Sequence, residues 1–197
     1  VVLTFDDSIY WPAPSPAAIT VLGYVDDIRI LGDKIDLTSD STYSYGITVA
    51  AYGNSGYGPK NAEHLFITGN ILNVVYNVNS GMGEGIYLDT IANPEISNNK
   101  ITVETKKAGA SNYGIQVADS SSYDTTHKLV SPYNVTIGDN DVTLNSADMA
   151  YGITVISTTP SENSKDMEIT NNNVNVVSET GAIGIGAVSS DVYIKDN

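Results

Sequence analysis

Tyrosine, carboxylate and amide side chains are the residues of this sequence whose chemistry suits a binding site. The chain has 13 Tyr against two Phe and one Trp. Tyr rings stack on the apolar faces of sugar rings, while Asp and Gln oxygens accept hydrogen bonds from hydroxyl groups. The candidate ligand-binding residues are Tyr52, Tyr57, Tyr87, Asp89, Gln116 and Tyr123.

The predicted loops determine how these residues would meet. Residues 50–62 and 118–133 are the two longest loops, and the connection between them in the stack, 89–93, is short. Two long loops would form walls around a floor that holds Tyr87 and Gln116. The alternative is that the loop tyrosines only pack their own loops. Tyr45, Tyr113 and Tyr151 are expected to stack on each other as a structural column.

The sequence supports a catalytic site less well than a ligand-binding site. Glycoside hydrolysis needs two carboxylates that converge on one bond. On the predicted strand faces Glu95 and Glu168 lie two repeats apart, with Thr136 between them. The enzyme alternative would use loop acids, which are Asp89, Asp119 and Asp124. We therefore expect a non-enzymatic protein, with a polysaccharide-cleaving enzyme as the alternative.

Histidine and acidic pairs give no complete metal motif. His64 is predicted to point outward and His127 to lie in a loop, so both are expected to be solvated. Asp26-Asp27 and the Asp139–Asp141 segment could attract calcium, but no calcium-binding loop is complete. Residues 81–85 lack the spacing of a dinucleotide-binding loop and are interpreted as a loop that leads into a strand. No cofactor is expected, and structural calcium stays open as an alternative.

Two short phrases recur along the chain and indicate a repeat protein. The first has an Asn in its centre, with clear copies at 67–74, 96–103, 137–144 and 169–176 and an Asp variant at 30–37. The second reads Tyr-Gly-Ile, or a close variant, and begins at Tyr45, Glu84, Tyr113, Tyr151 and Ile183. Both phrases alternate apolar and polar residues, which is typical of strands with one buried face.

Three short strands in each repeat predict a right-handed parallel β-helix, an all-β solenoid of about five to six coils, because crossovers between parallel strands are right-handed. Residues 26–197 are assigned to this β-helix. Residues 1–25 are assigned to an N-terminal cap or to the start of a preceding coil. The chain begins at Val1 and ends inside a repeat at Asn197, so we expect a segment of a longer protein.

The central Asn of the first phrase predicts a structural ladder. A sharp bend joins two strands at this point, and Asn tolerates the left-handed backbone conformation that such a bend needs. Stacked amide side chains can also hydrogen-bond from one coil to the next. The predicted ladder contains Asp33, Asn70, Asn99, Asn140 and Asn172.

Composition excludes several classes of partner. The formal net charge is −14, with 23 acidic and 9 basic residues, so nucleic acid and anionic lipid would be repelled. The sequence has no apolar stretch long enough to span a membrane, and no Cys. We expect no nucleic-acid binding and no membrane insertion of this segment.

Stacked coils with an Asn at one turn resemble the β-helix superfamily of pectate lyases and polygalacturonases, over about residues 26–197. The polygalacturonase motifs are missing; Arg29-Ile30-Leu31, for example, lacks the Lys of Arg-Ile-Lys. The Asn-Asn turns and Tyr-Gly-Ile strands are similar to the adhesin-like surface proteins of methanogenic archaea. That resemblance implies an extracellular, cell-surface location and a glycan or cell-surface protein as partner. The receptor-binding shaft of a viral fibre is a further alternative.

Overall fold

Parallel β-strands make up the regular structure of this protein. The computed structural model describes residues 17–22, 26–50, 62–77, 79–118, 132–156, 167–189 and 191–197, and the described part of the chain contains strands and no helices. It therefore offers no helix long and apolar enough to cross a membrane. All-β structure, as predicted, is confirmed.

The strands form three sheets, called A, B and C here. Sheet A contains β1 (Ala17–Leu22), β4 (Tyr43–Ala50), β7 (Gly81–Asp89), β10 (Ala110–Ala118), β13 (Ala150–Ile156) and β16 (Ala182–Val188). Sheet B contains β2 (Asp26–Leu31), β5 (Ala62–Thr68), β8 (Ile91–Ser97), β11 (Thr136–Gly138), β14 (Met167–Thr170) and β17 (Val192–Lys195). Sheet C contains β3 (Lys34–Ser39), β6 (Ile71–Tyr76), β9 (Lys100–Thr105), β12 (Asp141–Ser146) and β15 (Asn173–Ser178).

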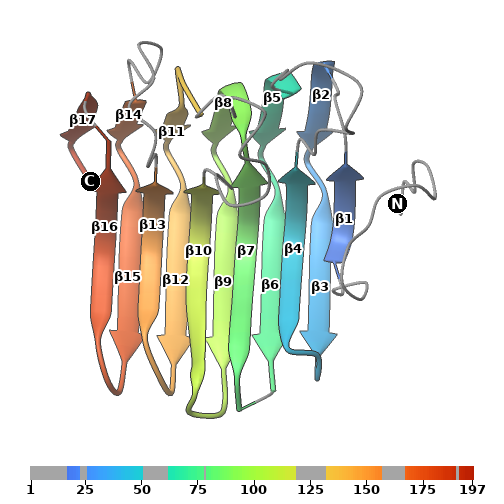
Figure 1. Cartoon of the computed structure of the whole chain (residues 1–197), viewed down its shortest axis with the longest axis vertical. Coiled ribbons are helices and arrows are strands. Elements are labelled where there is room, and N and C mark those ends of the chain that lie inside the picture. The colour runs from blue at the N-terminus through green and yellow to red at the C-terminus, as the bar shows by residue number, and fades with distance from the viewer. Residues whose placement is uncertain are drawn as a thin grey trace, which may run out of the picture.

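The chain visits the sheets in the fixed order A, B, C, and each strand pairs in parallel with its counterpart one repeat away (Figure 1). Equivalent residues in successive copies of the same phrase therefore lie side by side. Ile86, for example, pairs with Ile47 on one side and with Ile115 on the other. Three parallel strands per repeat, as predicted, are confirmed. Two sequence expectations are wrong: residues 81–85 belong to β7 rather than to a loop, and Asp89 ends that strand.

Aliphatic side chains from all three sheets form one core. Ile67, Ile96 and Ile137 are stacked neighbours in sheet B, and all three are fully buried. Each such side chain contributes roughly 1.5–3 kcal/mol when it leaves water. Ile194 is 48% exposed in β17, the last strand of sheet B, because no further described strand covers it.

A two-residue bend joins each sheet B strand to the following sheet C strand. Its first residue has a positive φ, between 56° and 70°, in all five of these bends: Gly32, Gly69, Asn98, Asp139 and Asn171. Asp196, which follows β17, has the same conformation. These are residue types that tolerate the left-handed region. The expectation that the ladder Asn itself adopts this conformation is wrong, because the left-handed residue precedes it.

The ladder Asn is buried and hydrogen-bonded on both sides. Asn99 Oδ1 accepts hydrogen bonds from the backbone N–H (3.0 Å) and the Nδ2 (2.9 Å) of Asn70. Asn99 Nδ2 donates to Asn140 Oδ1 at 2.9 Å and to the carbonyl of Ile67 at 2.8 Å. The amide is thereby satisfied at both lone pairs and both hydrogens. The same pattern continues through Asn140 and Asn172.

The two ends of the ladder differ from the prediction. Asp33 contributes its backbone N–H to Asn70 Oδ1 at 2.8 Å, but its exposed carboxylate is not part of the row. A carboxylate could not donate to the next Oδ1, so an interior Asp would leave that oxygen short of a donor. At the other end Asn197 joins the row, since its Oδ1 accepts from Asn172 N and Nδ2.

Glycine forms a second column, on sheet A. A Cβ on Gly114 would lie 2.3 Å from Cγ1 of Val142 and 2.5 Å from the carbonyl oxygen of Gly152. Gly46, Gly85 and Gly152 meet their neighbours equally closely. The second phrase therefore needs Gly here because sheet A approaches sheet C too closely for any side chain.

We predict that Asn99→Ala lowers the free energy of unfolding by roughly 2–4 kcal/mol, since several buried groups lose a partner at about 1–3 kcal/mol each. Urea unfolding measures this change. The control is Asn175→Ala, an exposed position on β15, where the change should stay within about 0.5 kcal/mol. Equal effects of the two substitutions would contradict a structural role for the ladder.

We also predict that Gly114→Ala lowers the free energy of unfolding by at least roughly 1–3 kcal/mol through overpacking. Gly184→Ala provides a matched control, because Gly184 pairs into the same column at β16 and has no atom within 4 Å of a Cβ. There the expected change is neutral, or a stabilisation of up to about 1 kcal/mol. Thermal unfolding measures both variants, and the prediction requires a lower melting temperature for Gly114→Ala than for Gly184→Ala.

Candidate functional site

The outer face of sheet A, the face directed away from the core, carries most of the candidate site residues. A Cβ on Gly83 or Gly85 would meet Tyr76 or Ile101, so both glycines face inward. Glu84, which lies between them, faces outward. Ile86 and Leu88 belong to the core, and so Tyr87 also faces outward. The inward pair Gly85-Ile86 therefore separates two outward columns on this sheet.

The first outward column consists mainly of tyrosines. Tyr45, Glu84, Tyr113 and Tyr151 occupy equal positions on β4, β7, β10 and β13. The rings of Tyr113 and Tyr151 stack with 4.7 Å between centroids and 7° between planes. Tyr45 is separated from this pair by Glu84. It tilts instead toward Tyr87, at 5.5 Å and 31°. The expected tyrosine column is thus interrupted by one carboxyl group.

The second outward column is Thr48, Tyr87, Gln116 and Thr154. Tyr87 and Gln116 are paired neighbours, and Tyr87 Oη donates to Asp89 Oδ2 at 3.4 Å. Asp89 is 1% exposed and its Oδ1 accepts a hydrogen bond from Thr90 Oγ1. The structure therefore brings together Tyr87, Asp89 and Gln116. The other predicted site residues, Tyr52, Tyr57, Tyr123, Asp119 and Asp124, lie outside the described residues.

Glu84 is the residue that sequence reasoning missed. Its side chain is fully buried, and neither carboxyl oxygen has a hydrogen-bond partner. Burial raises the pKa of Glu84 well above its ordinary value, because an ionised carboxylate is costly away from water. The carboxyl group is therefore neutral at a pH where a solvated Glu is charged. The available signal was the acid that replaces Tyr in a repeated phrase.

Two further buried polar atoms on this face lack a partner. They are Gln116 Oε1 and Thr154 Oγ1, and these two residues are paired neighbours on β10 and β13. A buried polar atom without a hydrogen bond costs about 1–3 kcal/mol. Together with Glu84, these atoms give the outer face hydrogen-bonding capacity that the described fold leaves unused.

The sheet A strands carry acidic residues and no basic ones. None of the sheet A strands contains Lys, Arg or His, while β7 contributes Glu84 and Asp89. Burial, with smaller contributions from nearby Glu84 and Tyr43, raises the pKa of Tyr45. Burial, with smaller contributions from Tyr151 and Glu84, raises the pKa of Tyr113 to about 12. Tyr45 and Tyr113 therefore stay neutral throughout the ordinary pH range.

The outer face of sheet B differs in both composition and exposure. Glu95 and Glu168 flank Thr136, two repeats apart, as the sequence indicates. Both carboxylates are exposed, and the guanidinium of Arg29 lies 5.3 Å from the Phe66 ring centroid. The described strands of this face pair two acids in register only at its beginning, where Asp26 on β2 is the partner of Glu63 on β5 and Asp26 is engaged with His64.

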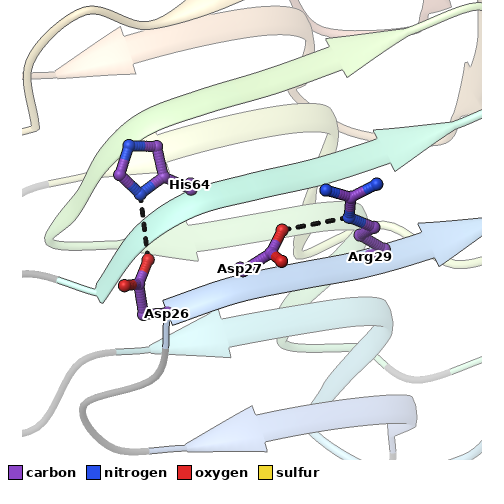
Figure 2. Close-up of polar contacts among 4 residues, drawn as sticks. All are labelled: Asp26, Asp27, Arg29 and His64. Carbon is purple, nitrogen blue, oxygen red and sulfur yellow. Dashed lines mark hydrogen bonds and ion pairs between the residues drawn. The ribbon is translucent and has the colours of Figure 1, made fainter.

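His64 forms an exposed pair at the beginning of sheet B. Its Nδ1 lies 2.9 Å from Asp26 Oδ1, and Arg29 Nε donates to Asp27 Oδ1 at 3.0 Å (Figure 2). The hydrogen bond with Asp26 raises the pKa of His64. Both partners are more than half exposed. Solvation of His64 agrees with the prediction; His127 lies outside the described residues.

Metal-binding groups are sparse where the chain is described. No group of three or more His, Cys, Asp or Glu side chains is placed to hold an ion among those residues. Asp26 and Asp27 are engaged with His64 and Arg29, and Asp141 Oδ1 accepts from Asn173 Nδ2 at 3.1 Å. Structural calcium stays a prediction.

Comparison of the chain with known protein families, with curated proteins and with solved structures finds no significant match.

We predict that Glu84 makes the fold less stable as pH rises. The folded state holds this proton more tightly than the unfolded chain, so the stabilisation is complete below about pH 4.5 and is lost above it, at up to about 1.4 kcal/mol per pH unit. Glu84→Gln should remove this slope and be the more stable protein at pH 7. Denaturant unfolding between pH 4 and 8 measures the difference.

The control for this experiment is Glu168→Gln, an exposed carboxylate on sheet B, which should leave the slope of the native protein unchanged. Parallel pH profiles for the native protein and Glu84→Gln would show that Glu84 ionises freely in the folded state.

Proposed function

We infer that this chain is a non-enzymatic, adhesin-like segment of an extracellular cell-surface protein, and that it binds a glycan through the outer face of sheet A. The observation that carries this inference is the set of buried, unpartnered polar atoms on a tyrosine-lined face: Glu84 Oε1 and Oε2, Gln116 Oε1 and Thr154 Oγ1. Aromatic surfaces with a few orienting polar groups are typical of small-ligand sites.

The scaffold proposed for this function is a right-handed parallel β-helix. Five complete sets of A, B and C strands run from β1 to β15, and β16 with β17 begin another set. Strand–crossover–strand units in parallel sheets are right-handed in about 98% of cases. A rigid stack of this kind suits a stalk that displays one face, because each repeat only needs its neighbours.

The geometry of the tyrosines supports a sugar as ligand. Tyr87, Tyr113 and Tyr151 are each partly exposed, so their rings lie at the boundary between the buried groups and solvent. Ring faces at this boundary can stack on the apolar face of a sugar, while Gln116 and Thr154 offer oxygens to its hydroxyl groups. Tyr52, Tyr57 and Tyr123 lie outside the described residues, and their contact with the ligand stays a prediction.

The enzyme alternative has one observation in its favour. Glu84 and Asp89 both belong to β7, and Tyr45 is electrostatically coupled to both carboxyl groups. Glycoside hydrolases use two carboxyl groups on either side of the bond that is cleaved, and in many of them one carboxyl group has a raised pKa. Release of reducing ends or unsaturated sugars from a polysaccharide panel would favour the enzyme. A trimer in solution would favour a viral shaft.

The proposed function predicts saturable binding of the purified chain to members of a glycan array. Tyr87→Ala and Gln116→Ala should each weaken binding of the best ligand at least roughly tenfold, which corresponds to the loss of about 1.4 kcal/mol from a binding contact. Calorimetric titration measures the affinity. Substitution of Tyr52, Tyr57 and Tyr123 by Ala tests the loop walls in the same way.

Tyr193→Ala is the matched control, because Tyr193 is an exposed tyrosine on the outer face of sheet B. It should bind the ligand as the native protein does. Binding that survives both sheet A substitutions would move the site away from this face.

A further inference from the structure

We propose that the sheet A site selects an organic cation, meaning a protonated or quaternary amine such as that of an amino sugar, and holds it among tyrosine rings with Glu84 as its counter-ion. This proposal rests on the proposed function and names the chemical class of its ligand. The observation behind it is a carboxyl group without a partner at the centre of a group of aromatic rings from neighbouring strands.

The rings come from four strands and enclose Glu84 by register. Tyr45 on β4 and Tyr113 on β10 are its two paired neighbours, and Tyr151 stacks on Tyr113 at 4.7 Å. Tyr87 lies on the same strand as Glu84 and contacts the Tyr45 ring at 5.5 Å. The faces of aromatic rings attract cations that lie within about 6 Å of the ring centroid.

The carboxyl group supplies the second part of the recognition. Neither oxygen of Glu84 accepts a hydrogen bond, and the side chain is fully buried. An amine would provide the missing donor or charge, and the acid would release its proton as the ion pair forms. A buried carboxylate is tolerated when it is paired, and is strongly disfavoured when it is alone.

The surrounding charges exclude the opposite class of ligand. Sheet A strands contain no Lys, Arg or His, and Asp89 lies on the same strand as Glu84. An anionic sugar would meet carboxyl groups that no basic residue of these strands balances. A neutral sugar would accept a hydrogen bond from the acid but would gain little from the negative ring faces. Only a cation uses both features.

Among the titratable groups around Glu84, the proton of Glu84 itself is the one that is released when a cation binds. Tyr45 on β4 and Tyr113 on β10 are the paired neighbours of Glu84, and Tyr151 on β13 is the next residue of the column. Tyr87 and Asp89 lie further along β7 itself. The tyrosines with raised pKa, Tyr45 and Tyr113, keep their protons at neutral pH. Uptake of a permanently charged cation therefore releases the Glu84 proton, and cation affinity should increase as pH rises from 5 to 8.

The test compares choline with its uncharged isostere 3,3-dimethyl-1-butanol, by calorimetric titration of the native chain. Choline should bind at least tenfold more tightly, with proton release that appears as a dependence on buffer ionisation enthalpy. Glu84→Gln should reduce choline affinity at least tenfold and abolish the proton release. Tyr151→Ala should weaken choline binding without abolishing the proton release, and Glu168→Gln should change neither quantity.

The outcomes separate this proposal from the proposed function. If glycans bind to the array but the charged and uncharged probes bind equally, or if Glu84→Gln binds choline as the native chain does, cation selection is wrong and glycan binding stands. If only amino-sugar members of the array bind, and more weakly after Glu84→Gln, both are supported. If neither glycans nor choline bind, both are wrong. A melting curve of each variant verifies that it is folded.

Discussion

The ladder of asparagine amides fixes the position of each repeat relative to its neighbours. Asn99, Asn140 and Asn172 each satisfy both lone pairs and both hydrogens of the buried amide with atoms of adjacent repeats, and Asn70 does so except for one lone pair. Because the side-chain period of a strand is two, a shift of one residue would turn the Ile and Val side chains outward. The ladder makes such a shift costly, because buried amides would lose their partners. The aliphatic core and the outer columns both follow from that register.

The chemistry of sheet A is a consequence of the same register. Parallel pairing places Tyr45, Glu84, Tyr113 and Tyr151 in one column, although they are far apart in sequence. The column of glycines behind them allows sheet A to approach sheet C closely. A single substitution in one repeat, Glu for Tyr, is therefore enough to place an acid among aromatic rings. No loop needs to be rearranged for this.

The sequence predicts the strands well, because alternation and repetition give independent evidence for them. The Ile of the second phrase lies in the core at Ile47, Ile86 and Ile115, as the alternation of apolar and polar residues predicts. The bend was misassigned by one residue, since both of its positions accept Asn. The Gly at positions 32 and 69 was the available signal, as only the first bend residue is ever Gly. Glu84 could not be found from alternation, which separates inward from outward positions. Whether an outward residue is buried depends on neighbours on adjacent strands, which a local pattern does not contain.

The direction of the asparagine ladder has a consequence for how such a protein can grow. Every interior Asn donates its backbone N–H and one amide hydrogen toward the C-terminal repeat, and accepts from the N-terminal one. Each repeat therefore presents hydrogen-bond donors to the repeat after it and acceptors to the repeat before it, and successive repeats are alike in this respect. Gene duplication can therefore add whole repeats to the stack of strands, all in the same orientation, and each added repeat finds the hydrogen-bond partners that the existing repeats already use. The residues of the aromatic column can then change in single repeats while the asparagine ladder stays unchanged.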